Sequence, residues 1–349
     1  YALSSAGVHE STTDVVFGGH CLIADNGRLA AESARFLREN FLILADVDFE
    51  RLAAGRLSES SFNDNKPLPS TGEMLHVTLE TDVPASPGLE YAFNPPRPFL
   101  PVPEHRDERC EEIISIQTAG IAKRMEHARV QRLVIGISGG LDSTLALLIC
   151  ARACRLLGRP ASDILAVTMP GFGTTDRTRS NAVRMCRLLG AELREIPISD
   201  QARERTQILM DLANKTRGLV VGTGDLSEIA LGWSTYNGDH MSMYAVNCSI
   251  PKTLIRCLIE HIAKESEPEL AATLVDISNT PVSPELLPPS DDGTIEQRTE
   301  DVLGPYDLHD FFLFHFIKYG APPNKILYLA EHAFRNEFQP EFIRRCLDI

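Results

Sequence analysis

The chain has 349 residues, a mass of 38.5 kDa and a formal net charge of −14, from 34 Lys and Arg against 48 Asp and Glu. Hydrophobic residues make up 43% and charged residues 23%, which is the composition of a globular protein and excludes a disordered or collagen-like chain. The acidic balance argues against sequence-independent nucleic-acid binding and against docking on anionic membranes, because both need a basic face.

No segment approaches the ~20 consecutive apolar residues of a membrane span, and no signal peptide is recognisable. A cytoplasmic location is therefore expected. The eight cysteines form no CxxC pair, which predicts buried free thiols in a reducing compartment rather than disulfides. The ten histidines show no metal-ligand spacing, and His309 and His315 lie six apart in one predicted helix, so no histidine metal site is expected.

Residues 1–52 are predicted to be rich in β-structure. Short apolar runs at 15–17, 21–24 and 41–48 predict strands, and Asn26-Gly27 is a strong signal for a hairpin turn. Residues 58–105 contain many prolines and little hydrophobic periodicity. They are predicted to be a linker or an extended arm.

From residue 109 onward, strands and helices are predicted to alternate. Helices are expected over 110–128, 144–157, 177–189 and 202–214, and short apolar strands over 133–137, 164–169, 193–198 and 219–222. This rhythm predicts an α/β fold with a doubly wound parallel sheet. Ligands of such sheets bind at the carboxyl ends of the strands, so the turns after the strands are the candidate sites.

The turn after the first of these strands is the segment 138–144, which reads Ser-Gly-Gly-Leu-Asp-Ser-Thr. The glycines permit a sharp turn and close approach to a ligand, and the N–H groups that open the following helix can bind an anion. The carboxylate of Asp142 would repel a phosphate unless a divalent cation bridged the two, so it predicts Mg²⁺ together with an oligophosphate. The turn is no Walker A loop, because no Gly-Lys-Ser/Thr follows. The alternative interpretation is an ordinary glycine-rich turn in which Asp142 and Ser143 cap a helix.

This string resembles the pyrophosphate-binding loop of the N-type ATP pyrophosphatases, a family with an adenine nucleotide alpha-hydrolase-like fold that includes NAD, GMP, asparagine and argininosuccinate synthetases. Segments 169–176, 222–228, 233–239, 249–253, 283–286 and 303–310 resemble, within that family, the bacterial glutamine-dependent NAD synthetases. Segments 11–14 and 18–20 are similar to the end of their nitrilase-like glutaminase domain, an α/β domain. The resemblance implies three parts: a nitrilase-like remnant (1–57), a proline-rich arm (58–105) and a synthetase domain (106–349).

The resemblance implies that ATP adenylylates the carboxylate of deamido-NAD, and that ammonia then displaces AMP. It implies three catalytic residues, Asp142, Glu228 and Lys252, of which Asp142 and Glu228 would also bind Mg²⁺. It implies an ATP site at Ser138, Gly139, Gly140, Leu141, Asp142, Ser143, Thr144, Thr174, Thr175 and Thr223. It implies a deamido-NAD site at Glu228, Trp233, Ser234, Thr235 and Tyr236, to which Arg203 is added from its place at the start of a predicted helix.

Each of these positions also has an ordinary structural interpretation. Thr223 and Asp225 could cap a helix, and Glu228 could be a solvated helix residue. Trp233 could belong to the core, and Lys252 after Pro251 could simply begin a helix. Arg203 and Arg205 oppose the dipole at the start of their helix, which favours an anionic ligand nearby over a plain surface.

Three departures from the family pattern bear on function. The glutaminase triad lies upstream of residue 1, the connection at Asp200 is unusually short, and the segment after Phe334 looks cut. A Cα–Cα distance between Asp200 and Gln201 well above about 3.8 Å would show chain missing between them. The chain alone is therefore expected to use free ammonium, whereas the full-length protein would use glutamine. A homodimer of synthetase domains is expected. A GMP synthetase-like amidotransferase and an inactive nucleotide-binding remnant are the alternatives.

Overall fold

The computed structural model describes residues 1–64, 77–78, 88–92, 94–170, 176–198, 202–234, 241–280 and 299–349. Two compact units make up these residues. One unit comprises Tyr1–Pro95 with His315–Phe338, and the other comprises Pro96–Phe314 with Gln339–Ile349. No helix in these ranges is long and apolar enough to cross a membrane.

The larger unit is built on a five-stranded sheet in the order β6-β5-β4-β7-β8, and every pair of neighbours is parallel. Its strands are β4 (Arg132–Gly136), β5 (Ile164–Thr168), β6 (Glu192–Glu195), β7 (Gly218–Gly222) and β8 (Tyr244–Ala245). The chain runs outward from β4 through β5 to β6, and then returns to the other side of β4 to form β7. This order confirms the predicted α/β fold with a parallel sheet.

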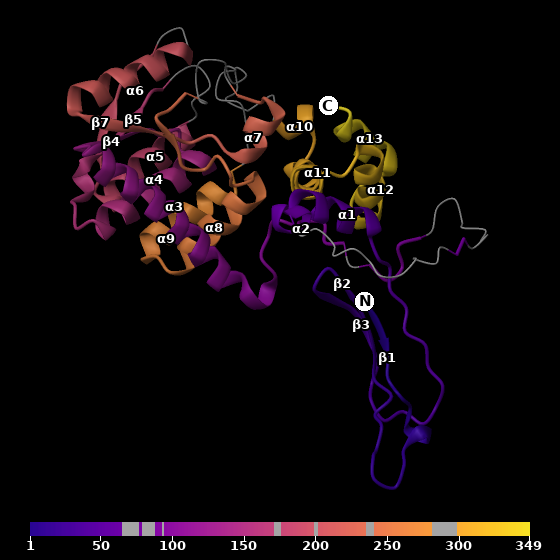
Figure 1. The fold of residues 1–349 in the computed structure, drawn as a ribbon. Helices are drawn as coiled ribbons and strands as arrows, with labels where there is room; N and C mark the ends of the chain where they lie inside the picture. Colours follow the sequence, from indigo (N-terminus) through magenta and orange to yellow (C-terminus); the bar gives the residue numbers. More distant parts are fainter. Residues whose placement is uncertain are drawn as a thin grey trace. The chain divides into compact units, whose positions relative to one another are not determined.

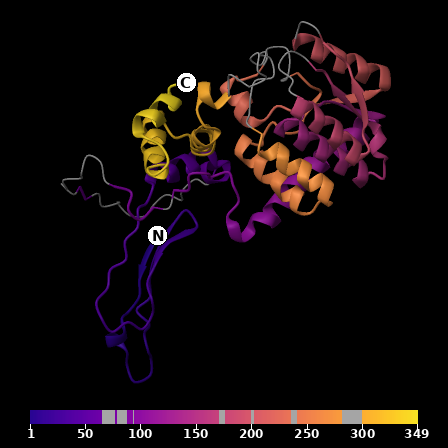
Figure 2. The same cartoon turned by 180° about the vertical axis from the view of Figure 1, so that it is seen from behind.

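Helices cover both faces of this sheet, as Figures 1 and 2 show from opposite sides. The bounds of the helices in this unit are α3 (Arg106–Ala128), α4 (Leu141–Leu156), α5 (Asp176–Leu189), α6 (Ala202–Thr216), α7 (Leu226–Leu231), α8 (Lys252–Lys264), α9 (Pro268–Ser278), α10 (Thr299–Leu303), the first part of α11 (Tyr306–Tyr319) and α13 (Pro340–Leu347).

Alternate residues of each buried strand point into two separate cores. Leu133 and Ile135 of β4 pack into the larger core, to which α3, α4, α8 and α9 contribute. Val134 packs into a smaller core, against which residues of α6 such as Leu209 lie. Apolar residues fill both alternating sets, so the strands appear in the sequence as continuous apolar runs rather than as alternating ones.

Some predicted element boundaries differ from those observed. The first helix of the larger unit begins at Arg106 rather than at 110, and α4 begins at Leu141 rather than at 144. The loop after β4 therefore contributes its last four residues to a helix. The strand predicted over 193–198 ends at Glu195, although the N–H groups of Ile196 and Ile198 still bond to carbonyls of the segment that begins at Thr168.

The smaller unit contains an antiparallel sheet in the order β1-β2-β3, with β1 (Ala2–Ser4), β2 (Cys21–Asp25) and β3 (Arg28–Glu32). Asn26 and Gly27 form the turn between β2 and β3, both with positive φ, as a two-residue hairpin loop requires. The unit also holds α1 (Phe49–Ser58), α2 (Ser60–Asp64), α12 (Pro323–Ala333) and the end of α11, and its predicted hairpin is confirmed.

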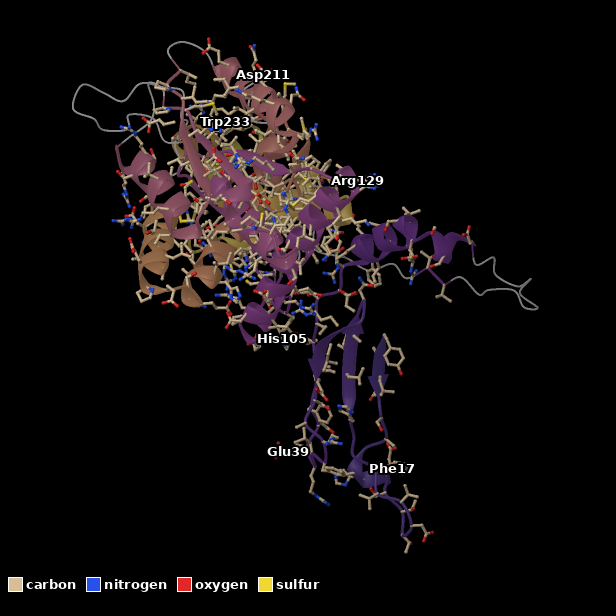
Figure 3. The ribbon with its side chains drawn as sticks, turned by 90° about the vertical axis from the view of Figure 1, so that its left-hand side faces the viewer. Phe17, Glu39, His105, Arg129, Asp211 and Trp233 are labelled. Carbon is tan, nitrogen blue, oxygen red and sulfur yellow. The ribbon has the colours of Figure 1, made fainter. Side chains whose placement is uncertain are left out.

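Two strands predicted in this unit are wrong. Residues 15–17 form no strand, because side chains of Ser11 and Thr12 accept the N–H groups of Phe17 and Val15 in place of a neighbouring strand. Residues 41–48 also form no strand, and Asp48 instead caps α1 by accepting from the N–H of Arg51. Figure 3 shows Phe17 and Glu39 in the extended segments beyond the ends of the three strands.

All eight cysteines are free thiols, as predicted, and five of them are buried. Cys248 is exposed, whereas Cys21 and Cys257 are half-buried. The sulfur atoms of Cys110 and Cys257 lie 3.8 Å apart between α3 and α8. His309 and His315 share α11, also as predicted.

Candidate active site

The candidate site lies where the order of the strands reverses. The chain leaves β4 toward β5 on one side and returns to β7 on the other, so the turns after β4 and β7 meet at the carboxyl edge of the sheet. The first turn leads into α4 and the second into α7. Ligands of doubly wound sheets bind at such a reversal.

The turn after β4 is tightly constrained by Gly139. Its φ is +85°, and a Cβ placed there would lie 2.1 Å from the backbone oxygen of Thr178. Only glycine satisfies both conditions, since a positive φ is strained for other residues and the neighbouring atom belongs to the backbone. Gly139 therefore brings the turn directly against the first turns of α5.

The hydroxyl groups of this turn hydrogen-bond to the turn itself. Ser143 Oγ lies 3.1 Å from Ser138 Oγ and donates to the carbonyl of Gly140 at 3.2 Å, while the N–H of Gly140 donates to Ser138 Oγ at 3.1 Å. Thr144, which is only 1% exposed, makes the first intrahelical bond of α4 by donating its N–H to Gly140. The N–H groups of Leu141 to Ser143 precede that bond and open the helix as an anion-binding end.

Beside this turn, one ammonium group is surrounded by three carboxylates. Lys252 Nζ lies 2.8 Å from Asp142 Oδ2, 2.6 Å from Asp225 Oδ2 and 2.7 Å from Glu228 Oε1. The lysine side chain is only 3% exposed. The four groups come from α4, the turn after β7, α7 and the first residue of α8, so the cluster exists only in the folded chain.

Lys252 and Asp225 have the ordinary structural roles, at the start of a helix and as a helix cap, and they also belong to the cluster. Asp225 caps α7 by accepting from the N–H of Glu228 at 2.8 Å, and the same side chain contacts Lys252. Lys252 is the first residue of α8, and its ammonium also lies among the carboxylates. A cation at a helix N-terminus opposes the helix dipole, and the three carboxylates offset that cost.

The cluster contains three carboxyl groups but only one ammonium group, so negative charge is in excess. Burial and the neighbouring charge of Asp142 raise the pKa of Asp225 to about 8, although the ammonium of Lys252 opposes the shift. The three carboxylates hold the pKa of Lys252 well above its usual value, against the effect of burial. Lys252 therefore stays charged, and the cluster retains capacity for further positive charge.

The ring of Tyr306 and the side-chain amide of Asn247 lie beside this cluster and its turns. The ring of Tyr306 has its centroid 5.4 Å from Lys252 Nζ, a cation–π distance. Asn247, which is fully buried, donates to the carbonyls of Asp142 and Thr223 at 3.0 and 3.2 Å, and accepts from Gln117 at 3.1 Å. Asn247 thus links the turn after β4 to the turn after β7.

A second buried network fixes the start of α8. Ser227 donates to Asp310 and accepts the N–H of Lys252 at 3.0 Å. Asp310 also accepts from the N–H and the hydroxyl of Thr253, at 2.9 and 2.6 Å. Burial raises the pKa of Asp310, but these bonds to its carboxylate oppose that shift. Lys252 is therefore held by its backbone as well as by its side chain.

The structure brings together Asp142, Glu228 and Lys252 with the 138–144 turn and Thr223. Trp233 and Ser234 lie immediately after α7, and the N–H of Trp233 bonds to the carbonyl of Glu228 at 2.9 Å. Arg203 belongs to α6, but its side chain lies outside the described residues. The other predicted positions, Thr174, Thr175, Thr235, Tyr236 and the Asp200 junction, also lie outside them.

Sequence reasoning missed part of the cluster. Asp225 was recognised only as a possible cap, and Asn247, Tyr306 and Asp310 carried no predicted role. Asp225 had a detectable signal, because it follows the strand beside β4 and ends the turn at the edge where ligands bind. The other three residues come from distant parts of the chain, and their sequence context shows no comparable sign.

The donor set of the cluster fits a hard divalent cation. One oxygen atom from each of Asp142, Asp225 and Glu228 can be chosen so that all three lie within 4.8 Å of one another. Asp142 Oδ1 is buried, and no described residue forms a hydrogen bond with it. Carboxylate oxygens are the ligands that Mg²⁺ takes in phosphate-binding sites.

A family model described as NAD synthase matches residues 113–202 and 199–338. The chain belongs to the NAD synthase family. The glutamine-dependent NAD(+) synthetase of Mycobacterium leprae is 40% identical over 377 residues, covering 96% of this chain and 54% of that protein. The Mycobacterium bovis protein of the same name is 38% identical, again over 96% of this chain and 54% of its own length. The chain thus spans about half the length of these NAD synthase relatives.

Solved structures show the same fold. A glutamine-dependent NAD(+) synthetase from Cytophaga hutchinsonii superposes with a TM-score of 0.54 at 14% identity, covering 95% of this chain and 54% of that one. At this identity the likeness concerns the NAD synthase fold alone.

Proposed function

We propose that this chain is the ATP-dependent synthetase part of a glutamine-dependent NAD synthetase, a carbon–nitrogen ligase that amidates deamido-NAD to NAD. The observation that carries the proposal is the contact of Lys252 with Asp142, Asp225 and Glu228 beside the 138–144 turn. This arrangement puts an anion-binding helix end, a buried cation and a set of carboxylates within one site.

The proposed reaction has two steps. The carboxylate of deamido-NAD attacks the α-phosphorus of ATP, and the bond to the β-phosphate oxygen breaks, which releases pyrophosphate and leaves an adenylate. The nitrogen of ammonia then attacks the adenylated carbonyl carbon, the bond to AMP breaks, and one proton is released. Both steps depend on alignment and on stabilisation of developing negative charge more than on a base.

The residues of the 138–144 turn would hold the pyrophosphate portion of ATP. The N–H groups of Leu141 to Ser143 open α4 toward it, and the buried ammonium of Lys252 would stabilise the charge that develops on the leaving group. Thr174, Thr175 and Thr223 would complete the ATP site. Deamido-NAD would bind along Glu228, Trp233, Ser234, Thr235 and Tyr236, with Arg203 near one of its phosphates.

Asp142 and Glu228 would hold Mg²⁺, with Asp225 as a third carboxylate beside them. When bound, the ion would neutralise the phosphate charge that these carboxylates would otherwise repel. The orphaned oxygen of Asp142 supports this assignment.

The organisation of the whole protein is also part of the proposal. Residues 1–57 would be the end of a nitrilase-like glutaminase domain, 58–105 an arm, and 106–349 the synthetase domain. The remainder of the glutaminase domain would supply ammonia from glutamine. Two synthetase domains would pair as a homodimer, and a cytoplasmic location stays a prediction.

The test is an assay with two nitrogen donors and two acceptor substrates. With ATP and Mg²⁺, the 349-residue chain is expected to form NAD from deamido-NAD and ammonium chloride at alkaline pH, but not from glutamine. Xanthosine monophosphate in place of deamido-NAD separates this function from a GMP synthetase-like one. Absence of pyrophosphate exchange into ATP in the presence of deamido-NAD would reject the proposal in favour of an inactive nucleotide-binding remnant.

A further inference from the structure

A second cluster of potential metal ligands lies away from the candidate active site, between α3 and α8. These helices lie side by side in the larger unit (Figure 1). Glu111 of α3, His261 of α8 and Glu265 at the end of α8 each offer one ligand atom, and these atoms lie within 4.8 Å of one another. Arg152 of α4, which adjoins this cluster, lies ten residues beyond Asp142, or about 15 Å along the helix.

The buried member of this cluster is His261, whose side chain is only 5% exposed. Its Nε2 atom is buried, has no hydrogen-bond partner among the described residues and faces Glu111 Oε2 at 3.7 Å and Glu265 Oε1 at 3.9 Å. Within the part of the chain that the structure describes, Glu111 Oε2 is likewise buried without a hydrogen-bond partner. A buried polar atom without a hydrogen bond has a cost that a bound cation would remove.

The distances suit coordination better than hydrogen bonding. A hydrogen bond between imidazole and carboxylate would bring the two atoms to about 2.8 Å. In a tetrahedral zinc site with bonds of about 2.1 Å, the ligand atoms lie about 3.4 Å apart. The observed separations of 3.7 and 3.9 Å between Nε2 and the carboxylate oxygens therefore need to close by only a few tenths of an ångström around an ion, while the two carboxylate oxygens lie within 4.8 Å of each other.

Neighbouring side chains hold these ligands in the orientation that a metal needs. Asp107 Oδ1 lies 3.3 Å from Nδ1 of His261, and a proton shared there leaves the Nε2 lone pair facing the cluster. Arg152 contacts the outer oxygens, Glu111 Oε1 at 2.6 Å and Glu265 Oε2 at 3.9 Å. The inner oxygens of both glutamates therefore remain turned toward His261.

We propose that Glu111, His261 and Glu265 form a binding site for a divalent transition-metal ion, with Zn²⁺ as its natural probe. One imidazole nitrogen and two carboxylate oxygens are ligands of zinc, whereas Mg²⁺ takes oxygen almost alone. The two glutamates are half exposed, at 46% and 58%, so an ion can enter and a water molecule can complete the tetrahedron.

The bound ion would tie α3 to the end of α8. The opposite end of α8 begins with Lys252, so the tie would stabilise the helix that positions the buried ammonium. The site is structural in this proposal, and it does not depend on the reaction assigned to the larger unit. Glu111 precedes His261 by 150 residues and Glu265 follows it by four, so the spacing between histidines gave no sign of the site.

The experiment is zinc binding by the untagged chain, measured by equilibrium dialysis in excess Mg²⁺ so that the carboxylates around Lys252 do not compete. One Zn²⁺ per chain is expected. H261Q should weaken binding by about 100-fold or more, and D107N by about 10- to 100-fold. His127 and Glu126 are exposed residues of α3 outside the cluster, so H127Q and E126Q are matched controls that should bind as the unmodified chain does.

Spectroscopy and melting provide independent measurements. Co²⁺ in the site should give the intense visible absorption of a tetrahedral complex, and E265Q should remove it. Zn²⁺ should raise the melting temperature of the unmodified chain and of H127Q but not that of E265Q. Because Glu265 is exposed, E265Q is expected to fold as the unmodified chain does. Zinc affinities of H261Q and E265Q equal to those of H127Q and E126Q, or no zinc binding by the unmodified chain, would overturn the proposal.

Discussion

The Nζ atom of Lys252 lies 2.8 Å from Oδ2 of Asp142, although the two residues are 110 positions apart in the chain. The contact joins the first residue of α8 to the second residue of α4. The contact forms only when α8 packs against the turn after β4. Substitution of Lys252 therefore tests this packing.

Replacement of Lys252 by methionine is expected to destabilise the protein by about 3–5 kcal/mol, because it leaves three clustered carboxylates without their cation. Pyrophosphate exchange should fall by about 10²- to 10³-fold. Urea denaturation and the exchange assay measure the two effects. Mg²⁺ should stabilise K252M more than the unmodified chain. K123M, at an exposed position on α3, is the control, and a K252M stability equal to that of K123M would contradict the assignment.

The turn after β4 can be tested through its glycine. G139A is expected to destabilise the chain by more than the about 1–2 kcal/mol that a positive φ alone costs, because its Cβ would lie 2.1 Å from the backbone oxygen of Thr178. ATP binding measured by calorimetry should be lost with it. Gly158 has a φ of +64°, and no described atom lies within 4 Å of its Cβ position. G158A therefore measures the cost of the positive φ without a steric clash. Equal losses in both variants would show that the close approach does not matter.

A pH effect is expected in the smaller unit. Burial lowers the pKa of His315 from 6.5 to about 4. Between these pH values His315 is protonated in the unfolded chain but neutral in the folded chain. The free energy of unfolding should therefore fall by up to about 3 kcal/mol as pH decreases from about 6.5 to about 4. Urea denaturation of the unmodified chain and of H315Q across this range measures the difference. H315Q should show a shallower decline, and parallel curves would rule out His315 as the source.

Thiol reactivity should follow burial. Burial raises the pKa of Cys110 to about 12 and also raises that of Cys150, so both thiols should resist alkylation in the folded chain. Cys248 is exposed and should react first with iodoacetamide. Mass spectrometry of peptides after a short pulse identifies the modified positions. Early labelling of Cys150 would indicate that α4 opens more readily than its packing implies.

The sequence predicted the parallel sheet because its strands are short apolar runs that leave little choice of environment. It also predicted the role of the turn after β4, because glycines and hydroxyls at the start of a helix form an anion site whatever surrounds them. Asp142 and Lys252 were both named as site residues. Their contact could not be derived from spacing, since it depends on the return of the chain to β7 beside β4.

The failures have a physical cause as well. Residues 41–48 have the apolar composition of a strand, but a strand needs a neighbour with which to pair, and composition says nothing about one. Leu42 is 80% exposed in the described structure. Asp225 illustrates the opposite case, because its capping role was visible locally while its contact with Lys252 was not.

The order in which the cluster is synthesised follows from the position of Lys252. Translation produces Asp142 first, then Asp225 and Glu228, and the cation that joins them only at the start of α8. A nascent chain that has passed residue 228 but not residue 252 holds mutually repelling carboxylates and no lysine to gather them. The cluster is therefore completed only after α8 leaves the ribosome, late in the synthesis of the chain.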